Sequence, residues 1–526
     1  MIYRTIGIIL IFTSLAAAVA HFSGLALPTL DWFFSFESKD KNLVEGTWWQ
    51  KYQGLVIGIF LCSITLVGGV ISFRKSFTKT QWNPQTVRKL KRFKSITRGY
   101  VSLWILVVLL LLTLLDHALV GKKALFVKYN GKIFSPAFVQ KNYSENDFGG
   151  DSASEADYRA LKERFKKENK GDWVLMPLVS SDATFDSEDP IRTELEEREG
   201  VYYMKGDKDP YSGLGYRFYA DDVDKRQSMV RFRKGKKQGR EEYYGRENSD
   251  FIGYYEWKDG KRSSKPLMGV EAVASVEAID ATPMLAVRYP PLPPSIKTGH
   301  YLGTDSRGWD VLAQIFGGLQ LVFQAAIIYL MVTYAVGITL GSLMGYIGGT
   351  FDILAQRLIE ILANVPFLYV VIIIADRIGR DDITLVTILL VLCIFSWIQI
   401  TYYMRTAAYK EKARDYVAAA RVLGAGPMRV IFKHVLPNAI SIVITLVPFS
   451  VVGVITALTA LDFIGFGLPD SYPSWGRLLS DGTQNLDYPW IVASVFSGMV
   501  AVLLLVTFVG EAVREAFDPK KFTTYR

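Results

Sequence analysis

The sequence predicts an all-α polytopic membrane protein that carries an inserted α+β domain. Half of its 526 residues are hydrophobic and its mean hydropathy is positive. The apolar residues are concentrated in eight stretches, and each approaches or exceeds the ~20 residues with which a helix crosses a bilayer. These stretches are apolar on all sides, whereas a helix of a soluble protein has an apolar stripe and a polar face.

The predicted spans divide the chain into four parts. An N-terminal two-span hairpin with a basic loop occupies residues 1–98, and the first core helix lies within residues 99–120. Residues 121–300 are predominantly polar, and residues 301–526 hold the remaining five spans. The eight predicted spans are Ile6–Phe22, Tyr52–Phe73, Tyr100–Val120, Leu319–Gly345, Leu358–Ala375, Ile383–Tyr403, Ile440–Phe466 and Trp490–Gly510.

Basic residues predict the orientation of these spans. Residues 74–98 contain nine Lys and Arg and no Asp or Glu, and short loops of this kind stay cytoplasmic. We therefore expect cytoplasmic N- and C-termini and an extracytoplasmic segment at residues 121–300. Because much of the net charge of +9 lies in this loop, the charge does not indicate nucleic-acid binding. Residues 1–20 also suit a cleaved signal peptide, an alternative that the sequence leaves open.

The polar region 121–300 predicts mixed secondary structure. Residues 155–170 are predicted to form a helix with Ser152 or Ser154 as its N-cap. At about residues 195–265, alternating apolar and polar residues between Gly-containing turns predict a β-like insert.

The composition also excludes several functions. Cys62 and Cys393 both lie in predicted spans and the four histidines are scattered, so neither a disulfide framework nor a metal site is expected. The sequence has no Gly-x-x-x-x-Gly-Lys-[Ser/Thr] loop for ATP phosphates and no recognisable hydrolase grouping. We therefore expect a chain that is not an enzyme and binds no cofactor itself.

Residues 406–438 are the most informative segment. Ala418–Leu423 predicts a helix that Gly424 ends, and a second helix begins at Met428 and ends before Pro437. The segment has no catalytic group, and small Ala side chains let a partner surface approach closely. We expect a cytoplasmic docking site for another protein, with an ordinary loop helix as the alternative.

This segment resembles the EAA loop of ABC-transporter permeases, whose pattern is Glu-Ala-Ala, then Gly, then Ile-x-Leu-Pro. Ala418 stands in place of the Glu and His434 in place of the Ile. The missing acid affects one polar contact with the ATPase and not the docking itself. The resemblance implies ATPase coupling through Ala418, Ala419, Ala420, Gly424, His434, Leu436 and Pro437.

Other stretches narrow the resemblance to oligopeptide and dipeptide C-type permeases. Residues 300–312 are similar to the segment before their core bundle, and residues 461–476 and 510–519 to their last two spans. The sequences of these motifs are most similar to those of the Yej-type subgroup, which is linked to peptide and microcin C uptake. The resemblance covers residues 93–150 and 300–526.

The resemblance implies a core of about six spans that forms half of a path for peptides or peptide-like compounds in a bacterial inner membrane. The implied partners are a homologous B-type permease, two ABC ATPases that use ATP and Mg²⁺, an extracytoplasmic solute-binding protein and membrane lipid, but no nucleic acid. Candidates for an external gate or a binding-protein contact are Gly303, Thr304, Asp305, Asp310, Asp462, Ser474 and Trp475. The alternative, favoured by the large insert, is a membrane-anchored sensor or assembly protein with a ligand-binding extracytoplasmic domain.

Overall fold

The chain forms two compact units in the computed structural model. The first comprises residues 1–186, 293–305 and 309–526, and the second comprises residues 187–292 and 306–308. The structure describes residues 2–25, 31–34, 48–75, 84–139, 141–150, 154–184, 186, 191–205, 208–246, 250–258, 260–266, 268, 270–288, 290–296, 298–379 and 383–517.

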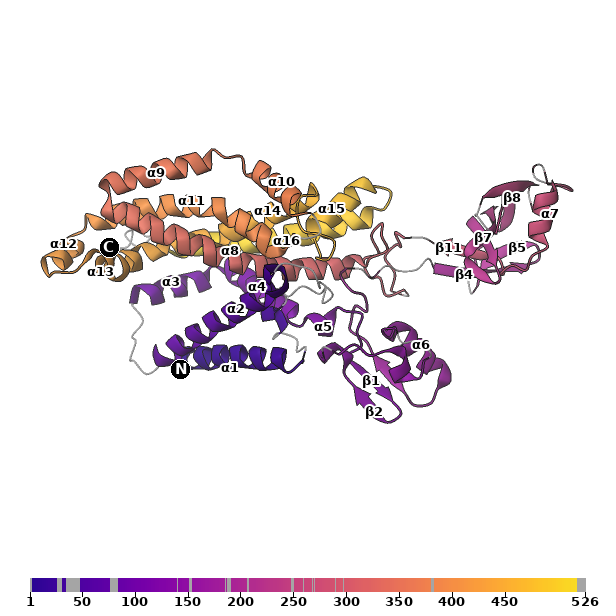
Figure 1. The fold of residues 1–526 in the computed structure, drawn as a ribbon, viewed down its shortest axis with the longest axis horizontal. Coiled ribbons are helices and arrows are strands. Elements are labelled where there is room, and N and C mark those ends of the chain that lie inside the picture. Colours follow the sequence, from indigo (N-terminus) through magenta and orange to yellow (C-terminus); the bar gives the residue numbers. More distant parts are fainter. Residues whose placement is uncertain are drawn as a thin grey trace. The chain divides into compact units, whose positions relative to one another are not determined.

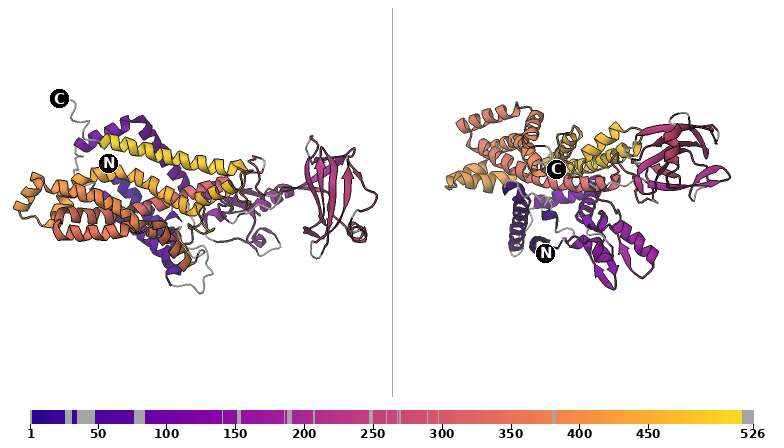
Figure 2. Two further views of the ribbon diagram at one scale, coloured as in Figure 1. Left: turned by 90° about the horizontal axis from the view of Figure 1, so that it is seen from above. Right: turned by 45° about the vertical axis from the view of Figure 1, so that its right-hand side comes forward.

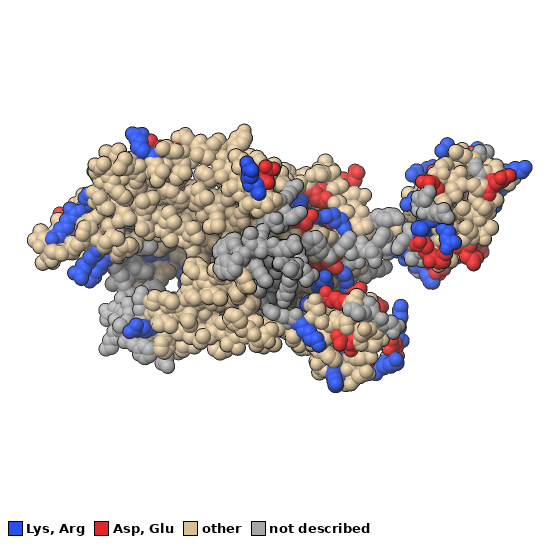
Figure 3. All heavy atoms as spheres, in the orientation of Figure 1, with Lys and Arg blue, Asp and Glu red and all other residues tan. Residues whose placement is uncertain are grey.

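Long apolar helices build most of the first unit (Figure 1). Five of the described helices contain a segment long and apolar enough to cross a membrane, and a bent helix pair would make a sixth. Few charged side chains lie along the sides of this bundle in the view of Figure 3. The five helices are α4 (Thr97–Leu114), α8 (Val311–Ile347), α11 (Leu385–Lys412), α14 (Leu436–Phe463) and α16 (Pro489–Phe517).

The bent pair consists of α9 (Gly349–Ala363) and α10 (Phe367–Ile378), which meet at 68°. The sequence predicts one span at Leu358–Ala375 with a break at residues 364–366, and the structure confirms the break. Proline disfavours the helical conformation of the residue before it and cannot donate a backbone hydrogen bond, so α9 ends just ahead of Pro366. The helical segment begins at Gly349, earlier than the predicted start of the span.

Two further helices, α1 (Ile2–Phe22) and α2 (Trp48–Lys75), pack against each other. The absence of a side chain at Gly7 lets the two helices approach closely, since a Cβ there would lie only 2.7 Å from a backbone nitrogen of α2. Their apolar portions Gly7–Phe22 and Gly58–Arg74 are shorter than the helices of the core. The five or six spans found among the described residues agree with the predicted core of about six spans, and α1 and α2 cover the other two predicted spans, Ile6–Phe22 and Tyr52–Phe73.

Helices α8 and α11 make the most extensive helix contact of the bundle. Gly337, Gly341 and Gly345 recur at every fourth position of α8 and face α11. A Cβ on Gly341 would lie 2.5 Å from the carbonyl oxygen of Thr401. Small residues at this spacing let two membrane helices approach until their backbones touch.

We expect Gly341→Ala to destabilise the bundle by roughly 1–3 kcal/mol, because overpacking forces the two helices apart. Thermal unfolding of the full chain in detergent measures this effect. Gly453→Ala in α14 is the matched control, since a Cβ there meets nothing within 4 Å. Equal losses of thermal stability in both variants would contradict the role assigned to the α8–α11 contact.

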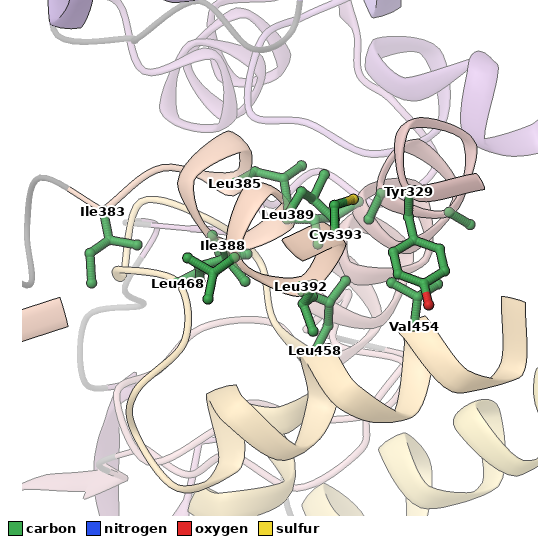
Figure 4. Packing of buried hydrophobic residues seen from close by; sticks show 14 of the residues in the cluster. Tyr329, Ile383, Leu385, Ile388, Leu389, Leu392, Cys393, Val454, Leu458 and Leu468 are labelled. Atoms are coloured by element: carbon green, nitrogen blue, oxygen red, sulfur yellow. The ribbon is translucent and has the colours of Figure 1, made fainter. Parts of the chain in front are cut away.

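The largest hydrophobic cluster lies where α8, α11 and α14 meet (Figure 4). From α11, Leu385 and Leu389 are each 1% exposed. Val454 and Leu458 of α14 pack in the same cluster, together with Tyr329 of α8. This cluster fixes the positions of three helices that the sequence separates by long intervals.

Helix α4 packs along α16, far away in the sequence (Figure 2). A Cβ on Gly99 would overlap the Cβ of Ala512, so only glycine permits this approach. An ion pair of 3.2 Å joins Arg98 to Glu511 at the same end of the two helices. The amphipathic helix α3 (Pro84–Ser95) precedes α4 and also contacts α16.

A small sheet follows α4 in the first unit. It consists of β1 (Phe126–Tyr129), β2 (Lys132–Phe134) and β3 (Trp173–Leu175) in the order β2-β1-β3, with antiparallel neighbours. One face packs around the buried ring of Phe148 and against α6 (Tyr158–Glu168).

Helix α6 confirms the helix predicted at residues 155–170, but the predicted cap is wrong. The N-cap is Asp157, whose Oδ1 accepts hydrogen bonds from the N–H groups of Arg159 at 2.8 Å and Ala160 at 3.3 Å. A carboxylate at this position satisfies free backbone donors and also interacts favourably with the positive end of the helix dipole. Of the two expected caps, Ser154 precedes the helix and Ser152 lies outside the described residues.

The second unit contains an eight-stranded antiparallel sheet in the order β10-β9-β8-β7-β6-β11-β4-β5. Helix α7 (Val270–Glu277) packs against β8 and β9 through buried Val273 and Val276. The strands are β4 (Ile191–Arg198), β5 (Val201–Met204), β6 (Gly213–Tyr219), β7 (Asp222–Arg233), β8 (Lys236–Tyr244), β9 (Phe251–Lys258), β10 (Lys261–Arg262) and β11 (Leu285–Arg288).

This sheet places strands in the region predicted to be β-like and extends beyond it on both sides. The predicted insert spans residues 195–265, whereas the compact unit includes residues 187–292. The difference arises because β11 follows α7 and pairs with the distant β4, for example Val287 opposite Arg192. The predicted domain 121–300 is correspondingly divided, since residues 121–186 belong to the first unit.

Candidate docking site

Helix α12 (Asp415–Val422) ends in a left-handed turn. Gly424 has a φ of +80°, a conformation that costs glycine little and other residues considerably more. The Gly424 N–H donates to the Arg421 carbonyl at 2.9 Å, and the Ala425 N–H donates to the Ala420 carbonyl at 3.0 Å. These two bonds make a Schellman motif, which confirms that the helix ends at Gly424. We call residues 415–425 the elbow.

The inner side of the elbow is fixed to the ends of α8 and α11. Val417 and Ala420 are buried in a cluster with Tyr346 of α8 and Ala408 of α11. The Arg421 Nε donates to the Tyr346 hydroxyl at 3.2 Å, and its guanidinium lies 5.0 Å from the centre of that ring. A displacement of the elbow would therefore move the ends of both helices.

Tyr416 ties the elbow to two other helices. Its hydroxyl donates to Glu411 Oε2 at 2.6 Å and accepts from Asn438 Nδ2 at 3.1 Å. Partial burial and the hydrogen bond to Glu411 raise the pKa of Tyr416 to about 12. The hydroxyl therefore keeps its proton, and its role as donor to Glu411, at neutral pH.

The outer side of the elbow is open. Ala418 and Ala419 are exposed, and at the tip the side chains of Val422 and Leu423 are 87% and 86% exposed. The alanine triplet is therefore divided, because Ala420 packs inward while its two neighbours point outward. Val422 and Leu423 are absent from the predicted set, although the sequence places these two large apolar residues directly before the glycine that ends the helix.

Residues 427–438 differ from the prediction, which has a second helix end before Pro437. Helix α13 (Pro427–Val430) continues through a π-helical turn at Ile431–Val435 directly into α14. The Leu436 N–H bonds to the Ile431 carbonyl five residues earlier. A proline ring would clash with the carbonyl four residues before it in a regular helix, and the wider turn relieves that clash. His434 and Leu436 are half-buried, and Pro437 is exposed.

Some of the predicted external residues gather at the start of α8. Asp310 is the N-cap of α8, and its Oδ1 accepts from the Ala313 N–H at 2.8 Å. Its other oxygen lies 2.7 Å from Nδ1 of buried His300. The Gly303 carbonyl accepts from the Val311 N–H at 3.0 Å, which closes the loop onto the helix.

Asp305 and Thr304 extend this arrangement. Asp305 Oδ1 accepts from the Trp309 N–H at 2.8 Å, and Oδ2 accepts from Gln314 Nε2 at 3.0 Å. The Thr304 carbonyl accepts from Nε1 of Trp490 in α16 at 3.2 Å. The loop before α8 is thereby joined to the last span.

The other three predicted residues connect α14 to α15 (Trp475–Gln484). Asp462 Oδ2 accepts from the Ser474 hydroxyl at 2.5 Å, and Oδ1 accepts from the Leu468 N–H at 2.7 Å. Ser474 caps α15, and Trp475 Nε1 donates to the Ile315 carbonyl of α8 at 2.9 Å.

Most of these external candidates are inaccessible from outside. Thr304, Asp305 and Asp310 are each 0% exposed, and Ser474 and Trp475 are also buried. Their observed contacts hold helix ends together. A gate or binding-protein contact at these seven residues stays a prediction, and the accessible surface there belongs to neighbours such as Tyr301, which is 41% exposed.

A bundle of several helices long and apolar enough to cross a membrane defines a multi-pass membrane protein. Residues 337–523 match the family model described as binding-protein-dependent transport system inner membrane component. The peptidoglycan transport system permease protein YejE of Agrobacterium fabrum is 31% identical, over 84% of this chain and 95% of its own length. The inner membrane ABC transporter permease protein YejE of Escherichia coli is also 31% identical, over 84% and 98%.

The oligopeptide transport system permease protein OppC of Haemophilus influenzae is 29% identical, over 43% of this chain and 72% of its own length. A solved chain of the inward-facing MetNI methionine ABC transporter aligns at 16% identity and a TM-score of 0.33, over 39% of this chain and 96% of that chain; this likeness is too weak to add to the assignment. The chain belongs to the YejE family of ABC-importer permease subunits. It is thus an inner-membrane transport component and not an enzyme.

Proposed function

We propose that this permease forms half of a path for peptides or peptide-like compounds and that its elbow binds an ATPase subunit. The observation that carries the docking proposal is the division of the alanine triplet. Ala418 and Ala419 are open to a partner, whereas Ala420 fixes the elbow to α8 and α11. Motion of a bound ATPase would thereby reach two spans of the bundle. The cargo class is supported by two relatives, the OppC permease of an oligopeptide transport system and the YejE permease of a peptidoglycan transport system.

The proposed assembly contains a homologous B-type permease, two ATPase subunits and an extracytoplasmic solute-binding protein. ATP and Mg²⁺ would be bound by the ATPase subunits. The elbow and both termini would be cytoplasmic, and residues 121–300 extracytoplasmic, in agreement with the basic loop at residues 74–98.

Cross-linking from the elbow tests this proposal. In the assembled transporter, a Leu423→Cys variant is expected to cross-link to the ATPase subunit, because this side chain is 86% exposed at the elbow tip. Glu163→Cys, on exposed α6, is the matched control and should give no such product. The native cysteines, Cys62 and Cys393, are buried. Absence of an ATPase product from position 423, or labelling of position 423 by an impermeant reagent from outside the cell, would refute the docking proposal.

A further inference from the structure

We propose that the exposed face of the β2-β1-β3 sheet rests on the membrane, at the boundary between lipid headgroups and acyl chains. We call the side chains of Phe126, Ile133, Trp173 and Leu175 the lipid face. The inference concerns a surface that the transport function does not use, and it does not depend on the elbow or on the cargo.

The strand register places these four side chains on one side of the sheet. Phe126 lies opposite Leu175, and Lys128 lies opposite both Ile133 and Trp173. Residues directly opposite in antiparallel strands project to the same face, and alternate residues of one strand share a face. The lipid face is thus a continuous apolar surface across all three strands, with a single lysine within it.

The lipid face is not required to form the core of this sheet. The core lies on the opposite face, where Val127 and Val174 are buried around Phe148. On the lipid face, the exposed fractions are 38% for Phe126, 67% for Ile133, 43% for Trp173 and 48% for Leu175. Contiguous exposure of such large apolar side chains indicates a surface that another phase or molecule covers.

The position of the sheet in the chain identifies lipid as the occupant. Strand β1 begins at Phe126, shortly after the span α4 ends at Leu114. Leu25, just after α1, forms an isolated β-bridge with Val139. The ring of neighbouring Phe138 lies 5.7 Å from that of Phe126. The sheet is therefore held at the ends of two apolar helices, where a bilayer surface would lie.

The lysines between the end of α4 and residue 144 fit the same occupant. Residues 117–144 contain five lysines and no Asp or Glu. Lys128 emerges within the lipid face, where its aliphatic stem can lie along apolar neighbours while its ammonium group reaches lipid phosphates. Trp173 supplies the aromatic residue that is enriched at membrane–water interfaces. Two copies of this face packed together would bring lysine against lysine, which disfavours self-association.

A fluorescent label on the sheet tests the inference in the full-length protein. Leu175→Cys and Ile133→Cys, each labelled with the environment-sensitive fluorophore NBD, are reconstituted in vesicles of phosphatidylethanolamine and phosphatidylglycerol. The matched control is Glu163→Cys on α6, which is exposed on the covered side of the sheet. We expect blue-shifted emission and severalfold stronger quenching by doxyl-labelled acyl chains at positions 175 and 133 than at position 163.

Three outcomes would overturn the inference. Equal access of aqueous iodide to positions 175, 133 and 163 would show that the face remains in water. Blue-shifted emission without quenching by lipid would show that protein covers it, either another segment of this chain or a partner. Disulfide cross-linking between copies of the unlabelled Leu175→Cys or Ile133→Cys variant would show self-association. Two labelling positions on different strands keep the test informative if one variant does not fold.

Discussion

Ala419→Asp is expected to abolish ATP-driven import while the chain remains folded and inserted in the membrane. The side chain of Ala419 is on the open side of the elbow, so a carboxylate there meets water in the isolated permease. Against a docked ATPase the same carboxylate loses its hydration and needs more space than a methyl group. An uncompensated charge at an interface costs several kcal/mol, enough to remove most of the bound ATPase.

The measurements are co-purification of the ATPase subunit and uptake of a labelled peptide by cells. Ala274→Asp, at an exposed position of α7 in the second unit, introduces the same charge at a residue outside the elbow and should leave both unchanged. Ala420→Asp is the contrasting variant, because Ala420 is only 8% exposed in the cluster that anchors the elbow. It should lower the thermal stability of the isolated permease, which Ala419→Asp should not. Normal import by Ala419→Asp would show that the elbow does not bind the ATPase.

The sequence predicts the membrane helices well because their signal is local. A long apolar segment can be read without knowing its neighbours, and the described α8, α11, α14 and α16 overlap the predicted spans. The end of α12 was predictable for a similar reason. Gly424 followed by Gly426-Pro427 ends a helix through the backbone preferences of these residues alone.

The errors arise where a distant partner decides the conformation. The short strand β11 gains its place in the sheet by pairing with β4 and β6, and its sequence carries little period-2 signal. Pro437 was expected to end a helix, but a π-helical turn, which relieves the proline clash, precedes it. The sequence did not show that the polar loop residues Asp305 and Asp310 are buried and accept hydrogen bonds from backbone N–H groups. A sequence alone shows that a residue is polar, not which donors surround it.

Asp462→Ala is expected to destabilise the permease by roughly 2–5 kcal/mol, because it removes a buried hydrogen-bond acceptor. Each carboxylate oxygen of Asp462 accepts one hydrogen bond, from Ser474 and from the Leu468 N–H. Removing the acceptor leaves two donors without a partner, and each buried donor left in this state costs about 1–3 kcal/mol. The connection between α14 and the N-terminus of α15 would loosen as a result.

Thermal unfolding of the purified chain in detergent measures the loss. Asp470→Ala is the matched control, because Asp470 belongs to the same loop and also pairs with α15, through Arg477, but its side chain is 59% exposed. An exposed ion pair contributes about 0–1 kcal/mol, so this variant should change little. Asp462→Asn retains an acceptor for the Leu468 N–H and should fall between the two. Similar stability of Asp462→Ala and Asp470→Ala would show that the connection between α14 and α15 does not depend on the Asp462 carboxylate. Asp462 would then be available for the predicted external gate or binding-protein contact.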